Sequence, residues 1–114
     1  MGYAEDLAIE LHEVWYVANS CKDLADAHDT AETTVAACSP SSALNDRAES
    51  IGLGTAVADA WVEARDELLT AIRTNAGSCR DTAGALELVI KHFTEQDDAV
   101  KREFDGKKEE LPYV

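Results

Sequence analysis

The sequence predicts an all-α protein, an antiparallel helical hairpin whose second helix is much longer than its first. Apolar and small residues recur with the three- and four-residue spacing of a helix in two long blocks. Glycine and proline are scarce within these blocks, and no segment alternates apolar with polar residues as a strand does. A chain of 114 residues can bury one modest core, so we expect a single helical-hairpin domain over residues 1–114.

The first helix is expected over residues 3–37. Its inward stripe consists of Leu7, Leu11, Val14, Ala18, Cys21 and Ala25, widened by Trp15, Leu24 and Ala31. Steps of four and three residues place these side chains on one face of a helix. Ser39-Pro40 should end the helix, because proline has no amide hydrogen and disfavours helical geometry in the residue before it. The connection follows over residues 38–54, with one short helical turn around residues 43–49.

The second helix is expected over residues 55–105, with Thr55 as its N-cap. Its stripe consists of Val57, Trp61, Ala64, Leu68, Ile72, Asn75, Cys79, Thr82, Leu86, Val89, Phe93, Gln96, Val100 and Phe104. Gly77 and Gly84 each weaken a helix by about 1 kcal/mol relative to alanine, so we expect them where two helices approach closely. The charged residues 106–114 should form a flexible tail.

The two helices differ in length, and this difference predicts a partner. At about 1.5 Å per residue the first helix is roughly 52 Å long and the second roughly 76 Å, so about four turns of the second helix lack a neighbour. Two hairpins that associate as a four-helix bundle would cover this overhang. We therefore expect a homodimer or heterodimer whose interface includes Leu86, Val89, Phe93, Val100 and Phe104.

Charge restricts the class of partner. The formal net charge of −13 disfavours nucleic acids and anionic membranes, because both would repel the chain. No run approaches the roughly 20 apolar residues of a membrane span, so we expect no membrane insertion. Glu5 and Asp6 stand where a cleaved signal peptide needs a basic region, so we expect no such peptide.

The residues that usually carry catalysis are scattered. His12, His28 and His92 form neither the Glu-x-x-His pair of di-iron bundles nor the His-x-x-x-His spacing of helical zinc sites. No Cys-x-x-Cys pair and no glycine-rich phosphate loop after a strand is present in the sequence. We therefore expect a protein that is not an enzyme and has no cofactor, metal or catalytic residue.

The cysteines leave two outcomes open. If residues whose numbers sum to the nineties face each other, Cys21 lies near the level of Cys79 on the inward stripes. The small neighbouring alanines would let two helices approach closely enough for a disulfide. Two buried thiols are the equally acceptable alternative. Cys38, near the turn, should stay free in either case.

The C-terminal run from Leu86 to Gly106 carries a family resemblance. It reads LELVIKHFTEQDDAVKREFDG: an aliphatic helix, Phe93, three residues, Asp97, a second aromatic and a glycine. This pattern resembles the C-terminal part of the EspC-like branch of the WXG superfamily, the type VII (ESX) secretion substrates of actinobacteria. The run GLGTAVADAWVEARDELL, residues 52–69, is similar to the start of the second helix in such proteins. The turn lacks Trp-x-Gly, and Phe93 stands where the export motif usually has tyrosine.

The resemblance implies a secretion substrate or co-secreted partner that leaves the cytoplasm by the type VII route. It implies that a secretion ATPase reads Phe93 and Asp97, and that the chain pairs with a small helical hairpin or with the N-terminal helical domain of a toxin. Residues four apart share a face of a helix, so a ring and a carboxylate could be read together. The alternative is a core aromatic and a solvated charge, as any helical bundle could place there. The alternative function is an intracellular immunity protein or chaperone-like module that binds a basic toxin surface.

Overall fold

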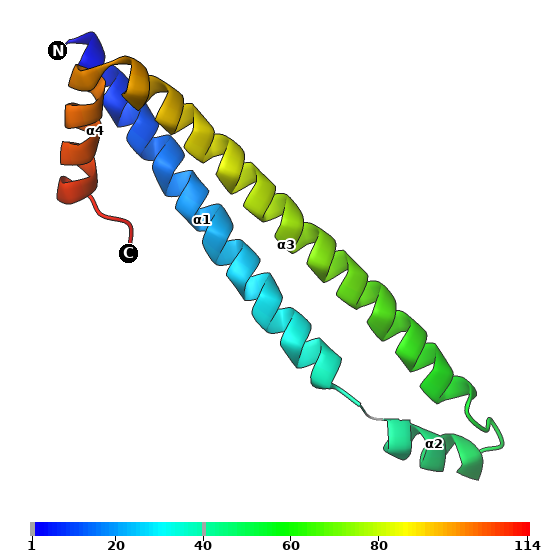
Figure 1. Cartoon of the computed structure of the whole chain (residues 1–114). Coiled ribbons are helices and arrows are strands. Elements are labelled where there is room, and N and C mark those ends of the chain that lie inside the picture. The colour runs from blue at the N-terminus through cyan, green and yellow to red at the C-terminus, as the bar shows by residue number, and fades with distance from the viewer. Residues whose placement is uncertain (1, 40) are drawn as a thin grey trace. The chain divides into compact units, whose positions relative to one another are not determined.

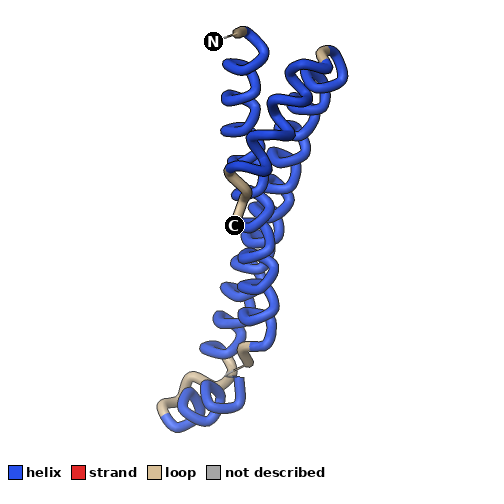
Figure 2. The backbone as a smooth tube through the Cα atoms, turned by 90° about the vertical axis from the view of Figure 1, so that its left-hand side faces the viewer, coloured by secondary structure: helices blue, strands red, loops and turns tan. Residues whose placement is uncertain are grey.

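The computed structural model describes residues 2–39 and 41–114, which form four helices and, within these ranges, no strand (Figures 1 and 2). The helices are α1 (Tyr3–Ala37), α2 (Ser41–Ser50), α3 (Ala56–Gln96) and α4 (Asp98–Glu110). The all-α prediction is therefore confirmed. Contacts group the chain into two compact units rather than one. Unit 1 comprises Met1–Ala25 and Ser78–Val114, and unit 2 comprises Asp26–Gly77.

The first helix and the turn after α2 follow local sequence rules. The bounds of α1 are those predicted, although Pro40, the expected helix stop, lies outside the described residues. Gly52 follows α2 with φ of 80°, a left-handed conformation that glycine adopts without steric cost. The Leu53 amide donates to the Ala48 carbonyl at 2.8 Å and the Gly52 amide to the Glu49 carbonyl at 3.1 Å. These two bonds satisfy the last carbonyls of α2.

The predicted second helix over residues 55–105 is wrong at its C-terminal end. The helix stops at Gln96, and Asp97 is extended, with φ −145° and ψ 110°. The carboxylate of Asp97 then accepts hydrogen bonds from the first turn of α4, which fixes the start of a new helix. The predicted tail is also wrong, because α4 continues through Gly106 to Glu110.

Unit 1 is a three-helix core, in which α4 lies beside the N-terminal part of α1 (Figure 1). Its buried cluster draws on all three helices and consists of Ala8, Leu11, Ile90, Val100 and Phe104. Phe93, Val14 and Trp15 pack against this cluster and are half-buried. The apolar overhang predicted for the second helix is therefore covered by the same chain. Its own α4 turns back and buries Val100 and Phe104.

Unit 2 is held by a smaller set of apolar side chains. Its buried residues are Ala48, Ala58, Leu69 and Ala76. Arg73 on α3 donates to the Glu32 carboxylate on α1 at 2.6 Å, and this pair is partly exposed. Because solvent screens such a pair, its contribution to stability is small. Small buried side chains therefore leave unit 2 with little apolar area.

The inward face of α3 differs by one position from the predicted stripe. From Leu69 onward its buried residues fall at a seven-residue repeat, Leu69, Ala76, Ala83 and Ile90, while Ala58 near its start is buried outside this repeat. The predicted Leu68 and Val89, each one position earlier, are exposed. Gly77 and Gly84 also differ from the prediction, because both are exposed and an added Cβ would meet nothing within 4 Å. Alanines, not glycines, are therefore the small residues of the packed face.

Candidate functional site at the corner between α3 and α4

Phe93 lies on the last turn of α3 and is half-buried. Its ring packs against the core cluster of unit 1 and meets the His92 ring edge-on, with centroids 5.3 Å apart. The next residue, Thr94, donates its hydroxyl hydrogen to the Ile90 carbonyl at 2.9 Å, a bond within the same helical turn. One side of the ring thus contributes to packing, while the remainder stays accessible.

Asp97 does not continue the helix of Phe93. Its Oδ1 atom accepts hydrogen bonds from the Ala99 amide at 2.9 Å and from the Val100 amide at 3.2 Å. These amides have no partner inside α4, so the carboxylate satisfies donors that a helix start leaves open. The expectation that Phe93 and Asp97 project from one continuous helical face is therefore wrong. The structure places them on either side of a helix end.

The predicted partner interface is divided by this corner. Val100 and Phe104 are 0% and 4% exposed, so they are part of the core of unit 1 and cannot serve a partner while α4 is docked. Leu86 and Phe93 are half-buried. Of the five predicted residues only Val89, which is 43% exposed, belongs to the open surface.

An exposed apolar face remains on unit 1, and it includes two residues, Leu24 and Val89, that the sequence placed on the inward stripes. Val17 and Leu24 are exposed on α1, seven residues apart and therefore on one face of that helix. Leu88 and Val89 are exposed on α3. The ion pair of Lys22 with Glu87 lies at one edge where α1 meets α3. In the seven-residue repeat of each helix, Val17, Leu24 and Val89 lie on the other side of the buried row from Lys22 and Glu87. These three side chains therefore line the opposite edge of the contact between α1 and α3.

The last residues of the chain are docked on α1. The His12 Nε2 atom lies 2.8 Å from the Leu111 carbonyl oxygen, and the Tyr113 hydroxyl donates to the Asp23 carboxylate. The Tyr113 ring also meets the rings of Trp15 and Tyr16, with centroids 6.4 and 4.8 Å away. The hydrogen bond to Asp23 raises the pKa of Tyr113 above 10.0, because it stabilises the protonated phenol. The apolar and aromatic residues after the charged run were the sequence signal for this docking.

The cysteines do not pair. Cys21, Cys38 and Cys79 are all free, and Cys38 is exposed. The ion pair of Lys22 with Glu87 sets the register of the antiparallel helices α1 and α3. In this register the part of α3 opposite Cys21 is about two turns, roughly 12 Å along the helix axis, from Cys79. The predicted facing of Cys21 and Cys79 is therefore wrong. A disulfide needs Cα atoms within about 7 Å.

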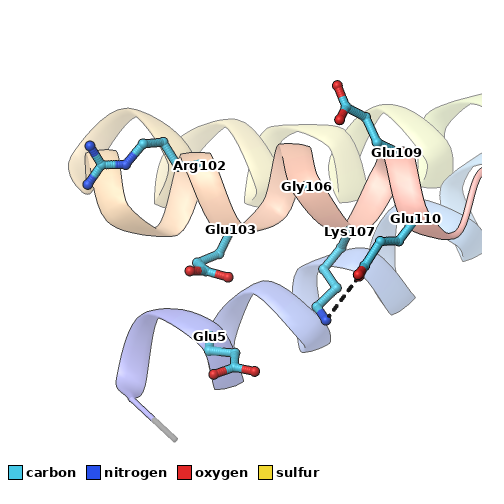
Figure 3. Close-up of a pocket in the computed structure, with 7 residues that line it drawn as sticks. All are labelled: Glu5, Arg102, Glu103, Gly106, Lys107, Glu109 and Glu110. Atoms are coloured by element: carbon cyan, nitrogen blue, oxygen red, sulfur yellow. Dashed lines mark hydrogen bonds and ion pairs between the residues drawn. The ribbon is translucent and has the colours of Figure 1, made fainter.

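An acidic groove runs between the start of α1 and α4 (Figure 3). Its volume is about 820 Å³, and its charged lining consists of Glu5, Arg102, Glu103, Lys107, Glu109 and Glu110. Lys107 pairs with Glu110 at 3.4 Å on the same helix. Carboxylates outnumber cations along this groove, so a cationic group is the charge it would attract.

Neither a metal site nor a membrane-spanning helix is found in the described parts of the chain. Within residues 2–39 and 41–114, no three or more His, Cys, Asp or Glu side chains are grouped so as to hold a metal ion. In the same ranges no helix combines the length and the apolar character needed to cross a membrane. Comparisons with protein-family models, with curated proteins and with solved structures gave no significant match to this chain.

Proposed function

We propose that this protein is a type VII (ESX) secretion substrate, or the co-secreted partner of one, that acts through helix–helix association. The observation that carries the proposal is the run from Phe93 to Asp97, whose resemblance to an export motif coincides with the corner of unit 1. A helix corner is a compact feature that a receptor groove can recognise by shape and charge together. The chain would be cytoplasmic before export and would leave the cell without cleavage of a signal peptide.

The two motif residues offer different groups to a receptor such as a secretion ATPase. The accessible part of the Phe93 ring would enter an apolar pocket. Both capping bonds of Asp97 end on Oδ1, so Oδ2 is the atom that would meet a basic group of the receptor. One carboxylate can thus hold the corner in shape and carry the charge that is read. This dual use ties recognition to the folded corner rather than to an extended peptide.

The partner would bind the exposed apolar face of unit 1. Val17, Leu24 and Val89 offer side chains whose burial is worth about 1.5–3 kcal/mol each when complete. Another small helical hairpin, or the helical N-terminal domain of a toxin, could cover this face and complete a four-helix bundle. A homodimer would use the same face twice. The interface proposed from the sequence thus moves from the end of the second helix to the hairpin face that includes Val89.

The export test separates the two roles of Asp97. Asp97→Ser keeps a side-chain oxygen for the cap and removes the charge, whereas Asp97→Ala removes both. Asp98→Ser is the matched control, since Asp98 is the adjacent acid and is exposed in the first turn of α4. Each variant is measured in culture supernatant and in cell lysate of a host with an intact type VII system, and again without its secretion ATPase.

We expect the parent and Asp98→Ser to be exported. We expect export to be lost in both Asp97 variants and in Phe93→Ala. Phe93→Tyr should be exported at least as well as the parent, because it restores the usual motif residue and keeps the ring. If Asp97→Ser is exported like the parent while Asp97→Ala is not, the cap alone matters and no charge is read. Equal export of all variants, or export without the ATPase, would remove the proposal.

The acidic groove favours one second candidate, an intracellular immunity protein or chaperone-like module for a basic toxin. Glu5, Glu103 and Glu109 give the groove its charge, and the chain as a whole carries −13. Association with a basic surface should be steered by charge and weaken steeply with salt. A toxin encoded beside this chain that binds with little salt dependence, or binds a Glu103→Gln/Glu109→Gln variant equally well, would exclude this candidate.

A further inference from the structure

The corner between α3 and α4 consists of one residue. Asp97 alone separates Gln96, the last residue of α3, from Asp98, the first residue of α4. No glycine or proline lies between Gly84 and Gly106, so the covalent chain permits a helix that continues through the corner. The bent form therefore depends on the Asp97 cap and on the packing of α4 against the rest of unit 1.

The seven-residue repeat of α3 continues into α4 without a change of phase. One row of the repeat is Ala83, Ile90, Asp97 and Phe104. The second row is Cys79, Leu86, Phe93 and Val100. Asp97 is the one charged residue among these eight, and the next member of the second row is Lys107. From Cys79 to Phe104 a straight helix through the corner would thus present two rows that are apolar except at Asp97, the pattern of a coiled-coil seam.

We propose that two copies of this chain exchange their α4 helices. In the exchanged dimer, α3 and α4 of each copy form one helix that passes through Asp97, and α4 packs on α1 of the other copy. The packing of Val100 and Phe104 with Ala8 and Leu11 is then re-formed between copies. Because each copy gives and receives the same helix, the contact is reciprocal and closes at two copies.

The tail contacts define the surface that receives α4. In one chain the Leu111 carbonyl lies at His12 and Tyr113 binds Asp23, both on α1. The same pairs form between copies after the exchange, because each α1 presents the same face. The helix that binds this face of α1 is therefore α4, from the same copy or from a second one. Assembly of this kind does not depend on the proposed export function.

Asp97 sets the balance between the two arrangements. In the bent form its carboxylate caps α4, whereas in a straight helix the charge would lie in an apolar seam and lose hydration. Both effects favour the bent single chain. Removal of the carboxylate should therefore favour exchange. A longer, flexible connection should oppose it, because a flexible linker cannot continue the helix through the corner and leaves α4 free to fold back on its own chain.

Two variants at Asp97 test the proposal, one that should favour exchange and one that should oppose it. Asp97→Leu removes the cap and fills the seam, and an insertion of Gly-Gly-Ser-Gly after Asp97 lengthens the connection. Molar mass is measured by light scattering over a concentration series. Asp97→Leu should dimerise about 25-fold more tightly than the parent, because each exchanged dimer straightens two corners and one lost N-cap is worth about fivefold. The insertion variant should lose the dimer that forms by exchange, and should dimerise less tightly than the parent.

A cross-link identifies the contact in the dimer. Tyr16→Cys and Tyr113→Cys are introduced into separate cysteine-free chains, at positions whose rings lie 4.8 Å apart in one chain. The two chains are unfolded together, refolded as a mixture and oxidised. Exchange predicts a disulfide-linked pair of unlike chains, enriched when both carry Asp97→Leu and nearly absent when both carry the insertion.

Two results would overturn the proposal. One is an Asp97→Leu protein that stays monomeric, and the other is a dimer that forms without the cross-link between unlike chains. If Asp97→Leu does not fold, the parent at high concentration decides the question. Equal yields of the cross-linked pair with and without the insertion would then show random encounter rather than exchange.

Discussion

Tyr113 donates its hydroxyl hydrogen to Asp23, and this bond joins the end of the chain to a helix ninety residues earlier in the sequence. It is one of several contacts that dock the residues after α4, together with His12 at the Leu111 carbonyl and the Trp15 ring. The C-terminal segment therefore belongs to unit 1. Its docking supports the packing of α4, on which the corner at Asp97 depends.

The Tyr113 bond gives the tail a dependence on pH. The folded-state pKa of Tyr113 is raised, so the bond contributes fully below the ordinary phenol pKa and is lost as pH rises through the folded value. Asp23→Asn keeps an acceptor but removes the negative charge, and should lower the titration midpoint of the Tyr113 ring in NMR spectra. An unchanged midpoint in that variant would contradict the contact.

Truncation of Phe104 should be far more costly than truncation of Val89. Phe104 is 4% exposed in the core of unit 1, so Phe104→Ala should lower the free energy of unfolding by about 3–5 kcal/mol. Val89→Ala changes an exposed site and should stay within about 0.5 kcal/mol. Chemical denaturation measures both. If both variants lost only a little unfolding free energy, α4 would not be docked. An undocked α4 is the arrangement of the continuous second helix predicted from the sequence.

Alanine should stabilise α3 at both of its glycines. Gly77 and Gly84 lie in helical backbone with open space around an added Cβ, so each Gly→Ala change should raise stability by about 0.5–1 kcal/mol. Gly52→Ala is the contrasting control. Its φ of 80° should make alanine cost about 1–2 kcal/mol. A loss of thermal stability in Gly84→Ala would instead indicate a close helix approach at that residue.

Oxidation should leave all three cysteines as thiols. The register set by Lys22 and Glu87 separates Cys21 from Cys79 by about two turns, too far for a disulfide. Alkylation under denaturing, non-reducing conditions should therefore add a label at every cysteine, as seen by mass spectrometry. Protein that takes up only one label would contradict this register.

Sequence rules accounted for the class of fold and for α1, because both depend on local preferences. The seven-residue repeat of α3 was harder to place, since Leu68 and Leu69, like Val89 and Ile90, offer two adjacent apolar positions. The buried Ala76 and Ala83 have small side chains, so their hydrophobicity does little to indicate which of the two adjacent positions faces inward. Only packing against a second helix selects one phase.

The corner at Asp97 could not be predicted for a different reason. The run from Gln96 to Ala99 has no glycine or proline, and aspartate is acceptable in a helix interior. The cap gains about 1 kcal/mol, and the burial of Val100 and Phe104 gains more. Both gains exist only once α4 meets α1. Tertiary contacts therefore override a sequence that is locally suited to continuing the helix.

The corner is tested most directly by NMR at Asp97 in dilute, monomeric protein. The structure predicts contacts from the α4 side chains of the core cluster, Val100 and Phe104, to its α1 side chains, which include Leu11. It also predicts an extended carbon chemical shift for Asp97 and no helical contact from Glu95 to Asp98. Helical shifts and sequential helical contacts that run unbroken from Phe93 through Asp97 to Phe104, without a contact to Leu11, would contradict it.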